Sequence, residues 1–102
     1  MVIISRQALR AFALRKPDAQ GVLDEWYQYV SKADWPNGAA VRTSFNSADY
    51  VGNNRFVFNI RGNNYRLIAS IAFSIRTIYI KFIGTHKEYD AIDAATVTLR
   101  KL

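Results

Sequence analysis

The residues best suited to chemistry lie between Gly84 and Asp90, in the sequence Gly-Thr-His-Lys-Glu-Tyr-Asp. This segment contains His86, the only histidine of the chain. An imidazole can take up or release a proton near neutral pH, as general acid–base catalysis requires. Tyr89 follows three residues later and shares the side of His86 if the segment is helical, and Lys87 carries a charge that can bind phosphate. These residue types fit proton transfer beside an anionic substrate.

The same segment is also typical of an ordinary helix start. Thr85 is a suitable N-cap, and the helix dipole favours Glu88 and Asp90 near an N-terminus. In this interpretation His86 is a surface residue of a capped helix. Spacing alone leaves both interpretations open, so the elements that deliver the segment must be considered.

The chain from Arg55 onward predicts an antiparallel β-meander. Polar and apolar residues alternate, and turn residues separate three expected strands, Arg55–Ile60, Tyr65–Phe73 and Thr77–Ile83. Gly62-Asn63 suits the tip of the first hairpin, with positive φ angles. This tip places Ile60 opposite Tyr65, Asn59 opposite Arg66, and Phe58 opposite Leu67.

Alternation also assigns the side chains of the meander to two faces. The apolar face is expected to carry Phe56, Phe58, Ile60, Tyr65, Leu67, Ala69, Ile71, Ile78, Ile80 and Phe82. The third strand runs back beside the second, so its end at Gly84 returns next to the start of the second strand. We therefore expect a set of polar side chains to converge at one edge of the sheet: Arg61, Arg66, Lys81, His86, Lys87 and Tyr89.

The first half of the chain is predicted to be mainly helical. After a short strand at Met1–Ile4 and the N-cap Ser5, apolar residues at spacings of three and four predict one helix over Arg6–Lys16 and a second that starts at Pro17-Asp18. A short third helix is expected from Ala39 to Ser44, and a last one from His86 to about Ala95, before a tail that ends at Leu102. The prediction is a single α+β domain over residues 1–102, with the N-terminal strand and two helices packed on the antiparallel meander and a short C-terminal helix.

Composition excludes several classes of function. The chain has no cysteine, which rules out disulfides, thiolate catalysis and zinc sites built on thiolates, and one histidine argues against a His-rich metal centre. We therefore expect neither a metal nor another cofactor. No secretory signal is visible, and no segment approaches the roughly 20 apolar residues that span a bilayer. A cytoplasmic protein without a membrane partner is expected.

The net charge of +6 is concentrated in the β-rich half. Residues 52–90 carry six Lys and Arg against two Asp and Glu, whereas residues 1–51 carry six against five. A basic surface favours a polyanionic partner, nucleic acid first, although a solubilising surface has the same charge. A metal-free set of His, Lys, Arg and Tyr suits attack of an RNA 2′-hydroxyl on the adjacent phosphate, because a base can remove the proton and cations can stabilise the transition state.

Two segments, Phe58–Ile68 and Tyr79–Asp90, resemble the HigB-type toxins of bacterial toxin–antitoxin pairs. The distinctive patterns are F-N-(I/V)-x-G-N-x-(Y/L)-R and T-H-x-E-Y-D, and both are present. The resemblance covers nearly the whole chain. It implies a RelE-like fold and a ribosome-dependent endonuclease that cuts translated mRNA. It also implies a cognate helix-turn-helix antitoxin, and binding of operator DNA only through the toxin–antitoxin complex.

The resemblance places the active site on His86, Arg66 and Tyr89, with Lys81 nearby. In this hypothesis Arg66 and Lys81 bind the scissile phosphate, His86 acts as general base or acid, and Tyr89 stacks on a base or assists proton transfer. Further RNA or phosphate contacts are expected from Lys87, Arg61 and Arg55. Two alternatives use the same basic edge: a non-catalytic RNA- or DNA-binding module, and a protein-binding domain that meets an acidic partner.

Overall fold

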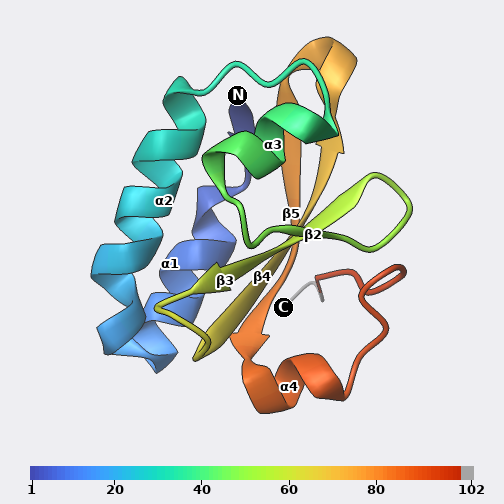
Figure 1. Ribbon diagram of the computed structural model, residues 1–102. Helices are drawn as coiled ribbons and strands as arrows, with labels where there is room; N and C mark the ends of the chain where they lie inside the picture. The colour runs from blue at the N-terminus through green and yellow to red at the C-terminus, as the bar shows by residue number, and fades with distance from the viewer. Residues whose placement is uncertain (100–102) are drawn as a thin grey trace.

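A computed structural model describes residues 1–99 and places all strands in one five-stranded sheet, in the order β1-β5-β4-β3-β2 (Figure 1). The strands are β1 (Val2–Ile4), β2 (Asp49–Tyr50), β3 (Arg55–Ile60), β4 (Tyr65–Ala72) and β5 (Thr77–Thr85). β1 runs parallel to β5, and the other neighbours are antiparallel. The end of the predicted tail, Arg100 to Leu102, lies outside the described residues.

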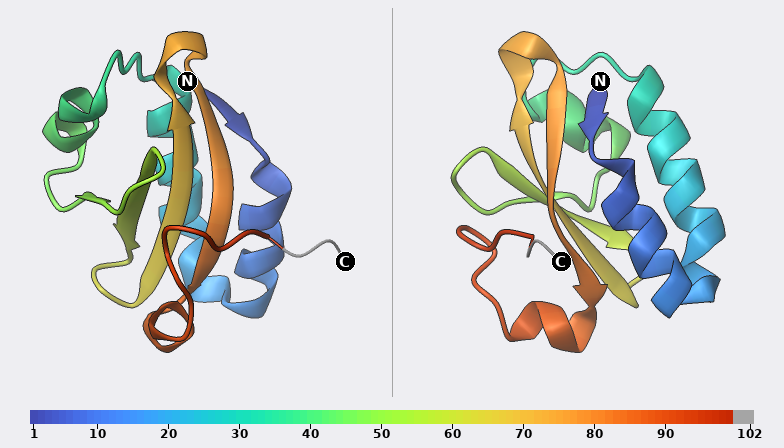
Figure 2. Two further views of the ribbon diagram at one scale, coloured as in Figure 1. Left: turned by 90° about the vertical axis from the view of Figure 1, so that its right-hand side faces the viewer. Right: turned by 180° about the vertical axis from the view of Figure 1, so that it is seen from behind.

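The helices lie mainly on one side of this sheet. They are α1 (Arg6–Arg15), α2 (Gln20–Lys32), α3 (Gly38–Ser44) and α4 (His86–Asp90), with a 3₁₀ turn at Pro17–Ala19 before α2 and another at Phe73–Ile75 before β5. Figures 1 and 2 show α1 and α2 side by side against one face, and α4 at the end of the sheet where β5 stops. The predicted α+β class, with helices packed on a β-meander, is confirmed.

The core forms between the helical stripes and the apolar face of the sheet. Helical spacing puts Leu9 and Phe12 on one side of α1, and Leu23, Trp26 and Val30 on one side of α2, and all five side chains are buried. Burying a side chain of this size stabilises the fold by about 1.5–3 kcal/mol. These contacts fix the sheet against α1 and α2, so the residues where β5 ends have defined positions.

Some element boundaries differ from the sequence predictions. The third helix starts one residue early, at Gly38, because the side chain of Asn37 accepts a hydrogen bond from the N–H of Ala40 at 3.0 Å. The last helix ends at Asp90 and not near Ala95. The edge strand β2 was not predicted, since two residues are too few for alternation to be visible.

The β3–β4 hairpin confirms the predicted register. Ile60 pairs with Tyr65 and Asn59 with Arg66. The positive φ angles fall on Arg61 and Gly62, one residue earlier than expected. The apolar face predicted from alternation is therefore correct along both strands of the hairpin.

A β-bulge in β5 overturns the predicted position of Phe82. Ile68 pairs with Phe82, but the next residue of β4, Ala69, pairs with Ile80, so Lys81 is an extra residue in β5. An extra residue reverses the alternation beyond it. Phe82 therefore shares the face of Ile68, away from α1 and α2, and Ile83 packs against the core instead.

The face of the sheet away from α1 and α2 is crossed by the residues after α4, Ala91 to Leu99, here named the C-terminal strap (Figure 2). Val57 and Ile68 point to this face, since they alternate with core residues, yet they are only 3% and 0% exposed. The side chain of Asn53, in the turn before β3, donates a hydrogen bond to the strap at the Ala95 carbonyl, at 2.7 Å. The strap thus lies over an apolar part of the sheet and is bonded to it.

Candidate active site

The start of α4 is fixed to the end of β5 by a capping box. The Thr85 hydroxyl accepts a hydrogen bond from the N–H of Glu88 at 3.1 Å, and the Glu88 carboxylate accepts one from the N–H of Thr85 at 2.9 Å. Arg15, at the end of α1, donates to the same carboxylate at 2.9 Å. The bond from the Thr85 backbone, helped by Arg15, lowers the pKa of Glu88. His86, the next residue after the cap, therefore has a defined position.

His86 is exposed, and it is oriented by two contacts. Its backbone N–H donates to the Asn64 carbonyl at 3.2 Å, which holds α4 against the β3–β4 turn. Its Nδ1 lies 3.1 Å from Oδ2 of Asp90. When Nδ1 carries the proton, it donates to Asp90 and leaves Nε2 free as a base. This partner could be inferred from the sequence, because residues four positions apart on the predicted helix, such as His86 and Asp90, lie on the same side.

Arg66 and Tyr89 meet on the face away from α1 and α2. Arg66 pairs with Gly84 across β4 and β5, and its guanidinium lies 5.7 Å from the centroid of the Tyr89 ring. Phe82 packs against Tyr89, and the centroids of the two rings lie 6.4 Å apart. Gly84 lets Phe82 approach, because a Cβ at Gly84 would lie 2.5 Å from Cζ of the Phe82 ring. The sequence placed Phe82 on the apolar face and not beside Tyr89, because the bulge that reverses its side chain does not change the alternation of polar and apolar residues in β5.

The cations at this end have unused donors. The only hydrogen bond of the half-buried Arg66 guanidinium to a described residue goes to the Asn63 carbonyl, at 3.3 Å. A guanidinium has five N–H groups in a planar fork that matches a phosphate. Lys87 is exposed on α4 and has no ion pair within residues 1–99. These side chains can therefore bind an anion from solution.

Arg61 lies at the same end of the sheet but is turned to the helical side. Its guanidinium pairs with Asp18, before α2, at 3.1 Å. The other oxygen of Asp18 accepts a hydrogen bond from the Tyr65 hydroxyl at 2.6 Å, and this bond raises the pKa of Tyr65. Arg61 therefore braces the hairpin turn against the start of α2 and does not join Arg66.

Lys81 and Arg55 lie farther from α4. The ammonium of Lys81 is 5.8 Å from the centroid of the Tyr79 ring. Arg55 begins β3 at the opposite end of the hairpin and is only 8% exposed. Its guanidinium donates to the strap carbonyls of Ala94 at 3.1 Å and Val97 at 2.6 Å. In this structure Arg55 is not available to an external phosphate.

The group at the end of the sheet thus combines an oriented imidazole, an aromatic ring, and a guanidinium with donors that no residue of 1–99 uses: His86, Tyr89 and Arg66. A base and a cation at the same end of a sheet suit proton transfer coupled to charge development on a phosphate. Within residues 1–99, no three His, Cys, Asp or Glu side chains gather as metal ligands. In the same part of the chain, none of the helices has the length and apolar character needed to cross a membrane.

Comparisons with known proteins agree in pointing to one family. Residues 19–92 match the family model described as HigB toxin, the RelE-like toxic component of a toxin–antitoxin system. The chain is 31% identical over 94 residues to an mRNA interferase HigB of Escherichia coli O6:H1, covering 90% of this chain and 91% of that protein. It is 30% identical over 104 residues to the mRNA interferase toxin HigB of Escherichia coli K12, covering 99% of each, and equally similar to an mRNA interferase HigB of Shigella flexneri.

Proposed function

Because the chain belongs to the HigB family of RelE-like toxins, we propose that it is an endoribonuclease that cuts translated mRNA on the ribosome. The RelE-like fold expected from the resemblance is confirmed by that membership and by the observed α+β architecture. Membership also implies a cognate antitoxin. The observation that carries the proposal is the oriented pair His86–Asp90, at the end of the sheet where the guanidinium of Arg66 makes a single hydrogen bond to residues 1–99.

The proposed reaction is attack of an RNA 2′-hydroxyl on its neighbouring phosphorus. Nε2 of His86 takes the proton of the 2′-hydroxyl, and the oxygen forms a bond to phosphorus. The bond from phosphorus to the 5′-oxygen of the next nucleotide breaks, and this oxygen takes up a proton from solvent. The products are a 2′,3′-cyclic phosphate and a 5′-hydroxyl, and no electron acceptor or metal is needed.

Two cations and one aromatic ring complete the proposed site. The guanidinium of Arg66 binds the phosphate oxygens in the dianionic transition state, where a preorganised donor is most effective. Lys87 makes a further phosphate contact from the exposed side of α4. The ring of Tyr89, steadied by Phe82 and Arg66, stacks on a nucleobase next to the cut. Lys81, the extra residue of the bulge in β5, binds a more distant phosphate.

The proposed partners follow from the same reaction. A ribosome holds mRNA extended and presents single nucleotides to a small enzyme whose own site is open and shallow, as the exposure of His86 indicates. Action there places the protein in the cytoplasm. The cognate antitoxin is proposed to be a helix-turn-helix protein, and the toxin–antitoxin complex, not the toxin alone, to bind operator DNA.

The test is cleavage of a defined mRNA by purified protein, with and without programmed ribosomes. We expect cuts only with ribosomes, with cyclic phosphate ends, and no cuts by His86→Ala. Lys32→Ala, on the last turn of α2, is the matched control and should cut like the wild type. Salt-dependent RNA binding without cleavage would instead support the non-catalytic binding module. Full cleavage by His86→Ala would overturn the assignment of the base.

A further inference from the structure

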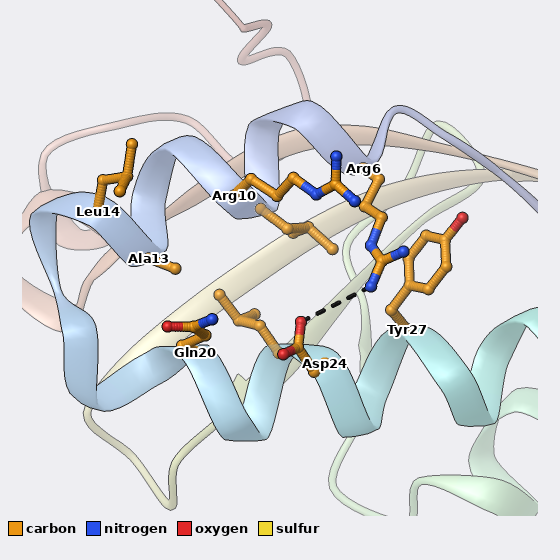
Figure 3. A pocket seen from close by; sticks show the side chains of 9 residues that line it. Arg6, Arg10, Ala13, Leu14, Gln20, Asp24 and Tyr27 are labelled. Carbon is orange, nitrogen blue, oxygen red and sulfur yellow. Dashed lines mark ion pairs between the residues drawn. The ribbon is translucent and has the colours of Figure 1, made fainter.

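A groove between α1 and α2 lies apart from the proposed active site. It has a volume of about 470 Å³, and its walls come from α1 and from the first half of α2 (Figure 3). Its floor is apolar, with Leu9, Ala13 and Leu23. Leu9 and Leu23 belong to the core and are only 3% and 2% exposed, so the floor exposes apolar surface mainly at the half-buried Ala13.

The α1 side of this groove is strongly basic. α1 contains three arginines and no acidic residue. Arg6 reaches across to Asp24 at 3.9 Å, a long contact for an ion pair, and its guanidinium lies over the Tyr27 ring at 4.3 Å (Figure 3). Arg10 points into the same space and has no ion pair within residues 1–99. The positive charge of this wall is therefore poorly compensated by the described residues, 1–99.

An exposed leucine extends the apolar floor. Leu14 lines the groove at the C-terminal end of α1, and it is 85% exposed. A single exposed leucine is ordinary on a protein surface, but here it adjoins an apolar hollow with a basic wall. The combination of an apolar strip and a row of cations matches the two faces of an amphipathic acidic helix.

We propose that this groove docks an acidic amphipathic helix of the cognate antitoxin. Its apolar side chains would lie on Ala13 and Leu14, and its carboxylates against Arg6 and Arg10. The inference rests on the toxin–antitoxin membership stated above, and it does not depend on the chemistry of the active site. It assigns the antitoxin a surface that the cleavage reaction does not use.

Charge and floor chemistry favour this occupant over two others. Two copies of this chain, each with a net charge of +6, would repel each other, whereas an acidic partner would be attracted. RNA would find the arginines, but its phosphates and sugars offer nothing to the apolar side chains Ala13 and Leu14. An amphipathic acidic helix would pair with the arginines and would also cover the apolar side chains of the groove.

The test is the affinity of the purified toxin for its purified cognate antitoxin, measured by titration calorimetry. Arg10→Glu and Leu14→Glu should each weaken binding by about 10-fold or more, since each places a carboxylate where an acidic helix would dock. Arg42→Glu, an exposed arginine of α3, is the matched control and should bind within about 2-fold of the wild type. Circular dichroism confirms that each variant is folded.

Three results would overturn the proposal. The first is unchanged antitoxin affinity in both groove variants. The second is self-association of the wild type in sedimentation that Leu14→Glu abolishes. The third is loss of ribosome binding in Arg10→Glu with antitoxin affinity retained. Because the groove variants keep the residues of the proposed site, they should still cut mRNA when no antitoxin is present, so failure of the docking proposal is distinguishable from failure of the proposed function.

Discussion

Arg66 and Arg55 lie at opposite ends of the same pair of strands, β3 and β4, and the chain uses them in opposite ways. Arg66 is half-exposed, and within residues 1–99 its guanidinium makes one hydrogen bond, to a carbonyl of its own turn. Arg55 is buried, and its guanidinium makes two bonds to the C-terminal strap. Arg66 therefore has N–H donors available to a ligand, whereas Arg55 uses its donors within the fold. A basic residue therefore indicates a binding site only when its donors are unused.

The same contrast applies to the two regions around these arginines. At the α4 end, capping and a histidine–aspartate contact orient side chains that remain open to solvent. At the Arg55 end, the strap crosses the sheet and accepts hydrogen bonds from Asn53 and Arg55. We infer that the α4 end serves the reaction and the Arg55 end serves stability, and each of the following predictions tests one side of this division.

Among the variants that test this division, the largest effect is expected from Arg66→Ala. Loss of a preorganised donor to the transition state should lower the cleavage rate on ribosome-bound mRNA by about 10²–10³-fold. The melting temperature should stay close to that of the wild type, because the side chain makes few contacts that stabilise the fold. Single-turnover cleavage assays measure the rate, and calorimetry measures the stability. A large loss of stability in this variant would show that Arg66, like Arg55, serves the fold and not the reaction.

Arg55→Met should show the reverse pattern. Removing the guanidinium leaves the strap carbonyls of Ala94 and Val97 without donors, and this should cost about 2–3 kcal/mol of unfolding free energy. Denaturant unfolding measures this loss, and hydrogen exchange should become faster in the strap. Cleavage per folded molecule should stay within about 3-fold of the wild type. Unchanged stability with abolished cleavage would show that Arg55 binds RNA.

Gly84→Ala should disturb the α4 end through packing. The new Cβ would lie 2.5 Å from the Phe82 ring, so the ring must move away. Tyr89 then loses its packing against Phe82. We expect a loss of about 1–3 kcal/mol in stability and a slower cleavage rate. Gly21→Ala is the control, because a Cβ there meets nothing within 4 Å and should stabilise α2 by about 0.5–1 kcal/mol. Equal stability of the two variants would contradict the close packing at Gly84.

The smallest effect is expected from the charge of Glu88. Its pKa is lowered in the folded protein, so the carboxylate contributes stability above its unfolded pKa of about 4.3, and the contribution is lost as the pH falls through the lowered value. Glu88→Gln should therefore reduce the melting temperature by about 1–4 °C at pH 7 and by less as the pH falls below about 4. Thermal melts across this range measure the difference. A gap that widens in acid would contradict the lowered pKa.

Alternation and helical spacing predicted most of the fold. They placed the hairpin register, the core stripes of α1 and α2, and the cap at Thr85, because these depend on local sequence periods. The parallel pairing of β1 with β5 was not predicted, since nothing in three residues specifies a distant partner. The bulge at Lys81 was missed for the same reason: it is set by the match of two strands and not by either strand alone.

The candidate site was predicted less completely than the fold. The sequence indicated His86, Tyr89 and Arg66, and the antiparallel pairing of β4 with β5 brings them to one end. It did not reveal that the donors of Arg55 are used by the strap, because that contact joins residues 39 and 42 positions apart. Charge counting treats both arginines alike, and only burial and partners separate them.

The most direct test of this division is primer-extension mapping of mRNA ends in cells after induction of the wild type, Arg66→Ala and Arg55→Met. Induction is carried out at a temperature at which all three proteins are folded. The division predicts new mRNA ends for the wild type and Arg55→Met, at the same positions, and none for Arg66→Ala. New ends with Arg66→Ala, together with their absence in folded Arg55→Met, would contradict it.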